Sequence, residues 1–297
     1  NYSLPILYTT QEVLDRNGID FNDGHMTMEK FYQQVEPFIS TQNKSKDHYV
    51  FSDTYGFSEF MLYSGLDFVD YDNKKIFLDT PEFIQLADTY MKLRDYFSTA
   101  EIRRKYKNFE YDMFKEGNAL FFSGYDNYNH TNLASFYAYV KELTSQDVML
   151  YPFPSYNGKA GSMAVAKYCM AVNENTGKKQ LAYNFIKTAI SEKIQSNYLL
   201  IYLPVNKKAL RKVLEDEAKK GQTNVTILGL PIVVQPLPED VREQYISMAE
   251  SVDKCVFIDT NVDNLLRISI GKYFLGKTTL EKAIKEAEKK ITLYLNE

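Results

Sequence analysis

Short apolar runs separated by helical patterns recur along this sequence, and this alternation limits the folds that the chain can adopt more than any other feature. The apolar runs lie at 4–8, 48–52, 119–123, 148–154 and 162–172. Most of them have the length of a buried strand. Between them, apolar residues recur at the three- and four-residue spacing of amphipathic helices. Helices that alternate with isolated strands are typical of α/β proteins. The sequence therefore predicts an α/β fold and leaves the order of the strands open.

Cap residues indicate where two of the helices begin. Thr80 is followed by Pro81 at the first helical position and by Glu82 beside the positive end of the helix, which makes this the clearest helix start in the chain. A second helix is predicted to begin after Thr27. Pro37 is predicted to end or kink that helix, because proline lacks the backbone N–H that an interior position donates.

Three helices are predicted near the C-terminus, at 239–252, 261–275 and 279–295. Their apolar stripes should be buried against elements from the first half of the chain. The side chains expected there are Val241, Tyr245, Met248, Leu265, Ile268 and Tyr273. The preceding stretch, 221–238, is rich in proline and β-branched residues, has no helical period and is predicted to be a loop.

Composition excludes several classes of partner. The 35 basic and 39 acidic side chains are spread evenly and give a formal net charge of -4, so there is no basic surface for nucleic acid or anionic lipid. No run approaches the roughly 18 consecutive apolar residues that a membrane-spanning helix needs. Cys169 and Cys255 form neither a disulfide framework nor a zinc motif. Two buried free thiols are predicted, with a disulfide as the alternative.

The residue groups that common enzymes require are missing from the sequence. Each of the three histidines, His25, His48 and His130, stands alone without metal-ligand spacing to another. Phosphate-binding loops, dinucleotide fingerprints and nucleophile elbows do not occur. We therefore predict a protein that is not an enzyme and that carries no metal or cofactor. Acid pairs such as Asp67 and Asp70 keep a hydrolase as the alternative.

The segment 119–128 combines a predicted strand with a loop of hydrogen-bonding aromatics. The strand 119–123 is followed by Tyr125, Asp126, Asn127 and Tyr128. A tyrosine ring can lie against the C–H face of a sugar while carboxylate and amide groups bond its hydroxyls. In an α/β fold, such loops at the carboxyl ends of strands often bind ligands. The loop is predicted to bind a neutral polyol, and the alternative is an ordinary surface loop.

Five stretches, taken in order, resemble the extracellular solute-binding proteins of bacterial ABC importers, in particular the carbohydrate-binding group. The segment "MFKEGNALFFSGYDNY" is similar to that family's Phe-x-x-Gly-x-Ala-(Met/Leu) strand followed by Gly-x-Trp, and "YPFPSYNGKAGSMAVAKYCMAV" resembles its return crossover. The other stretches are 2–31, 180–210 and 275–297. The stretch 180–210 contains "LPVN", which resembles the family's Leu-Pro-Val-Asn segment. This sequence departs from the family by having Thr9-Thr10-Gln11 in place of Tyr-Asn-Lys and by lacking tryptophan throughout.

This resemblance implies a two-lobe, periplasmic-binding-protein-like fold of type II. It implies that 1–154 and 209–297 form a largely complete C-terminal lobe, and that 155–208 belongs to a partial N-terminal lobe and includes the return crossover. Most of the N-terminal lobe is then expected to lie outside this chain. Apolar side chains that such a lobe would cover are expected to be exposed, namely Val165, Leu181, Phe185 and Ile186.

The resemblance also implies a function: a receptor that captures a sugar or oligosaccharide and delivers it to an ABC permease. Its location would be periplasmic, or at the cell surface through a lipid anchor that this chain lacks. The ligand-binding residues expected from it are Tyr8, Tyr55, Tyr125, Asp126, Asn127, Tyr128, Tyr156 and Ser162. The alternatives are a carbohydrate-active hydrolase and a structural module that kept the fold without ligand binding.

Overall fold

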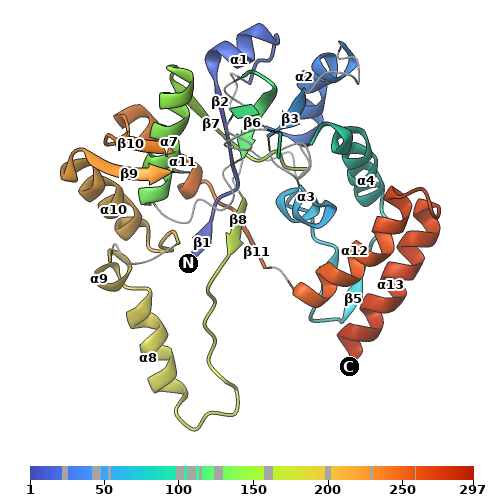
Figure 1. Ribbon diagram of the computed structural model, residues 1–297. Helices are drawn as coiled ribbons and strands as arrows, with labels where there is room; N and C mark the ends of the chain where they lie inside the picture. Colours follow the sequence, from blue (N-terminus) through green and yellow to red (C-terminus); the bar gives the residue numbers. More distant parts are fainter. Residues whose placement is uncertain are drawn as a thin grey trace.

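A four-stranded mixed sheet lies at the centre of the computed structural model (Figure 1). The model describes residues 1–21, 26–41, 48–52, 55–97, 104–105, 112–113, 116–123, 130–156, 163–197, 202–227, 230–257 and 259–297. The strand order is β3 (Tyr49–Phe51), β6 (Ala119–Ser123), β2 (Ile6–Thr10) and β7 (Val148–Pro152). β2 runs antiparallel to both neighbours, and β3 is parallel to β6. All four strands overlap the predicted apolar runs, although β2 covers 6–10 rather than the predicted 4–8.

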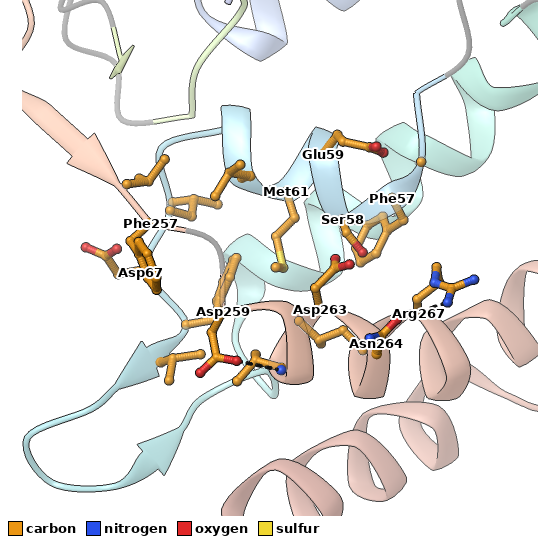
Figure 2. A pocket seen from close by; sticks show the side chains of 18 of the residues that line it. Phe57, Ser58, Glu59, Met61, Asp67, Phe257, Asp259, Asp263, Asn264 and Arg267 are labelled. Carbon is orange, nitrogen blue, oxygen red and sulfur yellow. Dashed lines mark hydrogen bonds between the residues drawn. The ribbon is translucent and has the colours of Figure 1, made fainter. Parts of the chain in front are cut away.

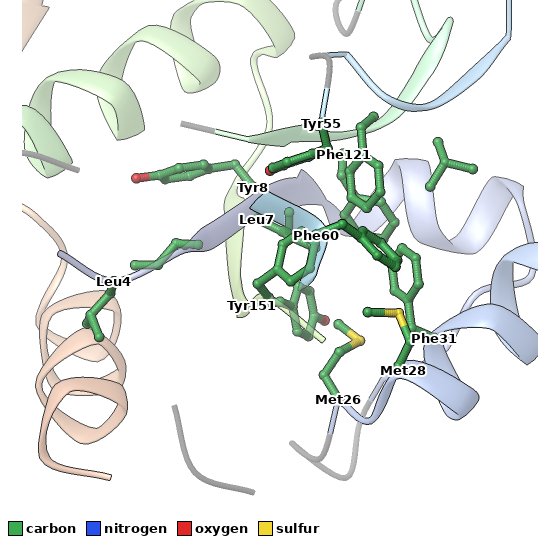
Figure 3. Close-up of a cluster of buried hydrophobic side chains, with 14 of the residues drawn as sticks. Leu4, Leu7, Tyr8, Met26, Met28, Phe31, Tyr55, Phe60, Phe121 and Tyr151 are labelled. Atoms are coloured by element: carbon green, nitrogen blue, oxygen red, sulfur yellow. The ribbon is translucent and has the colours of Figure 1, made fainter. Parts of the chain in front are cut away.

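Aromatic side chains form a connected cluster within the core (Figure 3). Phe31 of α2 (Met28–Thr41) stacks on Phe51 of β3, with 5.6 Å between the ring centroids. Phe51 also contacts Phe153, which lies edge-on to Phe60 of α3 (Phe57–Tyr63). Because rings of this size dominate burial, the cluster joins α2, α3 and the sheet into one body. Pro37 does not end α2, which continues to Thr41, so of the two predicted effects of this proline only a kink stays a prediction.

The three C-terminal helices occur as predicted and pack on the same core. They are α11 (Glu239–Glu250), α12 (Thr260–Phe274) and α13 (Leu280–Asn296). The expected burial is confirmed for Val241, Tyr245 and Met248, whereas Leu265 and Tyr273 are partly buried against the core. It is wrong for Ile268, which is 52% exposed because it lies on the outer face of α12.

Helices α12 and α13 lie beside α3 and α4 (Pro81–Leu93) in Figure 1. The predicted start of α4 is confirmed, since the Thr80 side chain accepts a hydrogen bond from the backbone N–H of Phe83. A short 3-10 helix, η1 (Arg94–Tyr96), follows α4, and Arg94 Nη1 donates to the carbonyl oxygen of Phe274 at 2.5 Å. A small hairpin of β4 (Val69–Asp70) and β5 (Lys75–Ile76) contacts α13.

A second group of elements covers β7 on the opposite side of Figure 1. It contains α7 (His130–Thr144), α10 (Lys207–Lys220), α11 and the hairpin of β9 (Thr223–Ile227) and β10 (Leu230–Val234). The hairpin corrects the predicted loop at 221–238. Its β-branched residues suit strands, and burial alternates along β10, where Ile232 and Val234 are buried and Val233 is 48% exposed. Pro231 is tolerated because a two-stranded sheet consists only of edge strands. A further short helix, α1 (Gln11–Arg16), follows β2 directly.

A three-stranded sheet connects distant parts of the chain. Its order is β1 (Tyr2–Ser3), β8 (Met163–Ala166) and β11 (Lys254–Val256). The strand predicted at 162–172 therefore ends at Ala166. Cys169 and Cys255 are free, as predicted, but exposed rather than buried. The reason is that Cys169 lies beyond the end of β8 and Cys255 lies on an outer strand.

An arm that consists of 167–177 and α8 (Lys179–Ala189) projects from the rest of the molecule (Figure 1). The expected exposure is confirmed for Leu181 and Phe185, and Ile186 is partly exposed. The expectation is wrong for Val165, which is buried in the central strand of the small sheet. A short helix, α9 (Glu192–Gln195), leads from the arm to α10. Among the described residues, none of the helices is long and apolar enough to span a membrane.

Candidate functional site

A cavity of about 700 Å³ lies between α3, the segment that follows it, β11 and α12 (Figure 2). Pockets of this volume suit small organic ligands. Its walls come from two distant parts of the chain, 56–71 and 255–274, together with Tyr90 of α4. The cavity is thus formed where the N-terminal and C-terminal halves of the fold meet.

Aromatic rings form the floor of this cavity. The ring of Phe57 lies edge-on to Phe274 at 4.8 Å and to Tyr90 at 5.2 Å. The O–H of Tyr90 donates a hydrogen bond to the carbonyl oxygen of Tyr55 at 3.1 Å. Burial raises the pKa of Tyr90 to about 12, so its hydroxyl stays protonated at neutral pH. Phe257, which is 65% exposed, supplies an open ring at the other end (Figure 2).

Polar side chains of α3 and α12 line one end of the cavity (Figure 2). Glu59 lies in the first turn of α3, and its carboxylate folds back so closely over Gly56 that a Cβ there would collide with it. Asp263 rises from the first turn of α12 towards α3. One turn further along, Arg267 Nη2 donates to Oδ1 of Asn264 at 3.0 Å.

Structural hydrogen bonds hold the acidic groups at the other end. Asp259 caps α12 by accepting from the backbone N–H groups of Asn261 (2.9 Å) and Val262 (3.2 Å). The O–H of Tyr294 donates to the same carboxylate at 3.3 Å. Burial and, to a smaller extent, the Asp259 charge raise the pKa of Tyr71 to about 12. Asp67 forms an ion pair with Lys254 at 2.7 Å.

The structure places three of the eight sequence-predicted ligand residues. Tyr8 is 0% exposed and Tyr55 is 6% exposed, so both rings belong to the core, although Tyr55 directly precedes the cavity wall at Gly56. Tyr156 is half-buried beside α4, where its O–H donates to Thr89 Oγ1 at 2.9 Å. Burial raises the pKa of Tyr156 to about 12. The other five predicted residues, Tyr125, Asp126, Asn127, Tyr128 and Ser162, lie outside the described residues.

The residues that line the cavity were not found by sequence reasoning. Glu59 and Asp263 each occupy the first turn of a helix, where an acidic residue is already expected beside the positive helix end. Phe257 follows a three-residue strand and carries no motif. Two sequence signals lay close to the cavity without pointing to it: Asp67, named above in an acid pair, lines it, and Tyr55 directly precedes the lining residues Gly56 and Phe57. The pairing of segments about 200 residues apart is a property of the tertiary fold.

Comparison with known proteins identifies the fold. No protein-family model and no curated protein sequence matches this chain. Solved structures do match it. The sugar-binding protein MalE from Xanthomonas citri is 11% identical with a TM-score of 0.66, and the match covers 99% of this chain and 69% of that one. An ABC substrate-binding protein from Listeria monocytogenes, solved with cycloalternan, is 11% identical with a TM-score of 0.59 and coverages of 99% and 70%.

A third match is the cyclic alpha-maltosyl-1,6-maltose binding protein from Arthrobacter globiformis, at 14% identity and a TM-score of 0.57, with coverages of 99% and 70%. The chain therefore has the α/β fold of two-lobe type II periplasmic binding proteins and spans about 70% of the length of these matches. The predicted fold class is confirmed. At these identities, the likeness establishes the fold and leaves the ligand to be argued from the site.

Proposed function

We propose that this protein is an extracellular solute-binding receptor that binds a sugar or oligosaccharide in the cavity between α3 and α12. One observation carries the proposal: open and buried aromatic rings share a cavity of about 700 Å³ with carboxylate, amide and guanidinium groups. Aromatic faces pack against the C–H faces of a saccharide, and the polar groups bond its hydroxyls. The three matched proteins, which are named for sugar binding or contain a bound saccharide, support this reading.

Within this proposal, Phe257 is the stacking residue and Asn264 and Arg267 are hydroxyl-binding residues. Phe257 suits stacking because its ring is largely exposed on the cavity wall. Asn264 and Arg267 suit hydroxyl binding because their mutual hydrogen bond orients an amide N–H group and a guanidinium beside the cavity. The loop residues Tyr125, Asp126, Asn127 and Tyr128, together with Tyr156 and Ser162, remain proposed additional contacts.

We propose the remaining features of the receptor on the same basis. The ligand would be passed to an ABC permease, from a periplasmic location or from the cell surface through a lipid anchor. Residues 1–154 and 209–297 would form one lobe, and 155–208 would belong to the second. The exposed apolar side chains on α8 support that division, because an unpaired apolar helix face is normally covered. A hydrolase is not favoured, since the matched structures named above are binding proteins.

Isothermal titration calorimetry with a panel of oligosaccharides tests the function. The panel contains maltotriose, a cyclic glucan, cellotriose and a glucosamine trimer. At least one should bind, and Phe257→Ala should weaken its binding by about 1 kcal/mol, or roughly fivefold, the loss typical of one aromatic stacking contact. Phe77→Ala is the matched control, because Phe77 is 48% exposed but lies outside the cavity wall. Failure of every saccharide to bind, or equal affinities of the two variants, would refute the assignment.

A further inference from the structure

Large apolar side chains are exposed along the arm and the short helix that follows it. Leu181 and Phe185 of α8 are 64% and 68% exposed. The large apolar side chains exposed between residues 170 and 194, here called the arm patch, are those of Met170, Leu181, Tyr183, Phe185, Ile190 and Ile194. Soluble proteins rarely leave so much apolar surface in one region uncovered unless it is a contact surface.

The arm patch occupies two flanks of α8. Leu181 and Phe185 are four residues apart and therefore lie on one flank, where they line an open groove of about 440 Å³ together with Met170. Tyr183 is two residues from each of them and so lies on the other flank, and Ile190 follows it there two turns later. Because α8 projects from the rest of the molecule, both flanks are open to a partner (Figure 1).

The area of the arm patch is that of a specific protein interface. If a large side chain exposes about 200 Å² when fully accessible, the exposed fractions of the patch amount to roughly 600 Å². Specific interfaces bury about 600 to 1,000 Å² on each partner. A lipid surface would cover only one flank of the helix, whereas a protein with an arm and a body can cover both.

Charges at the two ends of α8 favour a second copy of this chain in antiparallel orientation. Lys178 and Lys179 lie at the N-terminal end, where the first turn contains no acidic residue and the helix dipole disfavours a cation. Glu192, at the start of α9, lies just beyond the other end. Antiparallel α8 helices would bring Glu192 of each copy beside the lysines of the other. Lys193 offsets part of this charge, so charge sets the direction of pairing and the apolar patch supplies the affinity.

We infer that the arm is the interface of a homodimer, in which the arms of two copies lie antiparallel and Leu181 and Phe185 of each copy contact the groove of the other. Two-fold pairing presents the same surface on both copies, and this surface contains both a groove and the apolar side chains that can fill it. The arms extend past each other, so the flank with Tyr183 lies against the body of the second copy. The inference concerns assembly and does not depend on whether the cavity binds a saccharide.

Sedimentation velocity over a concentration series tests the inference on the 297-residue chain. The chain should form dimers with a Kd of about 10 μM or below, since interfaces of this size have micromolar or tighter affinity. Leu181→Asp should weaken the dimer roughly tenfold or more, because it buries a charge in the interface. Leu293→Asp is the matched control: Leu293 is 65% exposed, lies on α13 away from the arm, and should leave the Kd unchanged. Circular dichroism confirms that both variants are folded.

Charge reversal tests the antiparallel direction. At low ionic strength, Lys179→Glu and Glu192→Lys should each weaken the dimer roughly two- to fivefold, the range of exposed ion pairs. Combining both substitutions in one chain should restore the Kd, because each copy then offers the exchanged charges to the other. A double variant that is weaker than either single variant would refute the antiparallel arrangement.

The remaining outcomes decide between a second copy and other partners. A chain that is monomeric at about 0.1 mM, tenfold above the expected Kd, overturns the inference. Equal weakening by Leu181→Asp and Leu293→Asp overturns it as well, since the dimer would then form elsewhere. If the monomer instead sediments with phosphatidylglycerol vesicles, and Leu181→Asp abolishes this, the arm patch binds a lipid surface and the homodimer is wrong.

Discussion

Replacement of Phe274 by alanine tests whether the aromatic floor of the cavity holds α12 to α3 and α4. The ring is 8% exposed, and its centroid lies 4.8 Å from the centroids of both Phe57 and Tyr90. Truncation of a buried phenylalanine usually costs about 3 to 5 kcal/mol of unfolding free energy. Part of this ring borders the cavity, where it has no packing partners to lose. We therefore expect the low end, about 3 kcal/mol.

Urea unfolding followed by circular dichroism measures this loss. Because the chain has no tryptophan, the helical signal is a more direct probe than fluorescence. With a slope of about 3 kcal/mol per molar, as expected at the upper end for small proteins, the midpoint should fall by roughly 1 M. Phe274→Leu retains most of the apolar contact and should lose about 1.5 kcal/mol or less.

Ile268→Ala is the matched control on the same helix. Ile268 is 52% exposed on the outer face of α12, so its truncation should change the unfolding free energy by about 0.5 kcal/mol or less. A loss below about 1 kcal/mol in Phe274→Ala, or a loss equal to that of Ile268→Ala, would show that α12 is not anchored through this ring. The cavity wall would then need another explanation.

Two further predictions concern ionisable side chains outside the cavity. Tyr245 is fully buried, its hydroxyl has no hydrogen-bond partner in the described part of the chain, and burial raises its pKa well above the ordinary value. Tyr245→Phe should therefore leave the unfolding free energy unchanged or raise it by up to about 1 kcal/mol, as measured by urea unfolding. A lower unfolding free energy would reveal a bonded hydroxyl. Hydrogen bonds from Lys272 and Lys290, each at 2.6 Å, lower the pKa of Glu286 below its ordinary value of 4.5. Its folded pKa is thus below its unfolded pKa, so its stabilising effect is present above the unfolded pKa and lost as the pH falls through the folded one. Melting curves should show the wild-type advantage over Glu286→Gln at neutral pH and its loss as the pH falls below the ordinary value of 4.5.

Local signals predicted the regular elements well. The four central strands are short, apolar and bounded by polar residues, and the start of α4 depends on the adjacent pair Thr80 and Pro81. These features act over a few residues, so one sequence is enough to recognise them. The closing helices α12 and α13 were recognised for the same reason, because their apolar stripes persist over four turns or more.

Errors arose where a residue's environment depends on a distant partner. The strand predicted at 162–172 ends at Ala166, because β1 and β11 pair with it no further than that residue. Tyr8 was selected as a ligand residue from a family resemblance. It lies in β2, between β6 and β7, and the rings of Phe122 and Phe136 pack against the Tyr8 ring. Neither strand pairing nor the covering of a face can be read from spacing along the chain.

The candidate site was the least predictable part of the molecule. Glu59 and Asp263 lie in its two walls. Each occupies the first turn of a helix, where an acidic residue is common for local reasons and does not indicate a site. Only the packing of α3 against α12 brings the two walls together. The Tyr-rich loop was selected because its residues are adjacent in sequence. A site made of adjacent residues is the kind that sequence inspection can detect directly.

The two walls of the cavity also differ in when they are synthesised. Contacts beside the cavity join residues 180 and 189 positions apart, between Arg94 and Phe274 and between Lys254 and Gly65. On the ribosome, α3 and its aromatic rings emerge long before α12, so the nascent chain carries Phe57 uncovered for most of translation. Closure of loops this long is a slow, late event in folding. The cavity is therefore completed only after the residues up to Phe274 have left the ribosome. A chain that stops short of α12 has the strands of the central sheet but lacks one wall of the proposed ligand cavity.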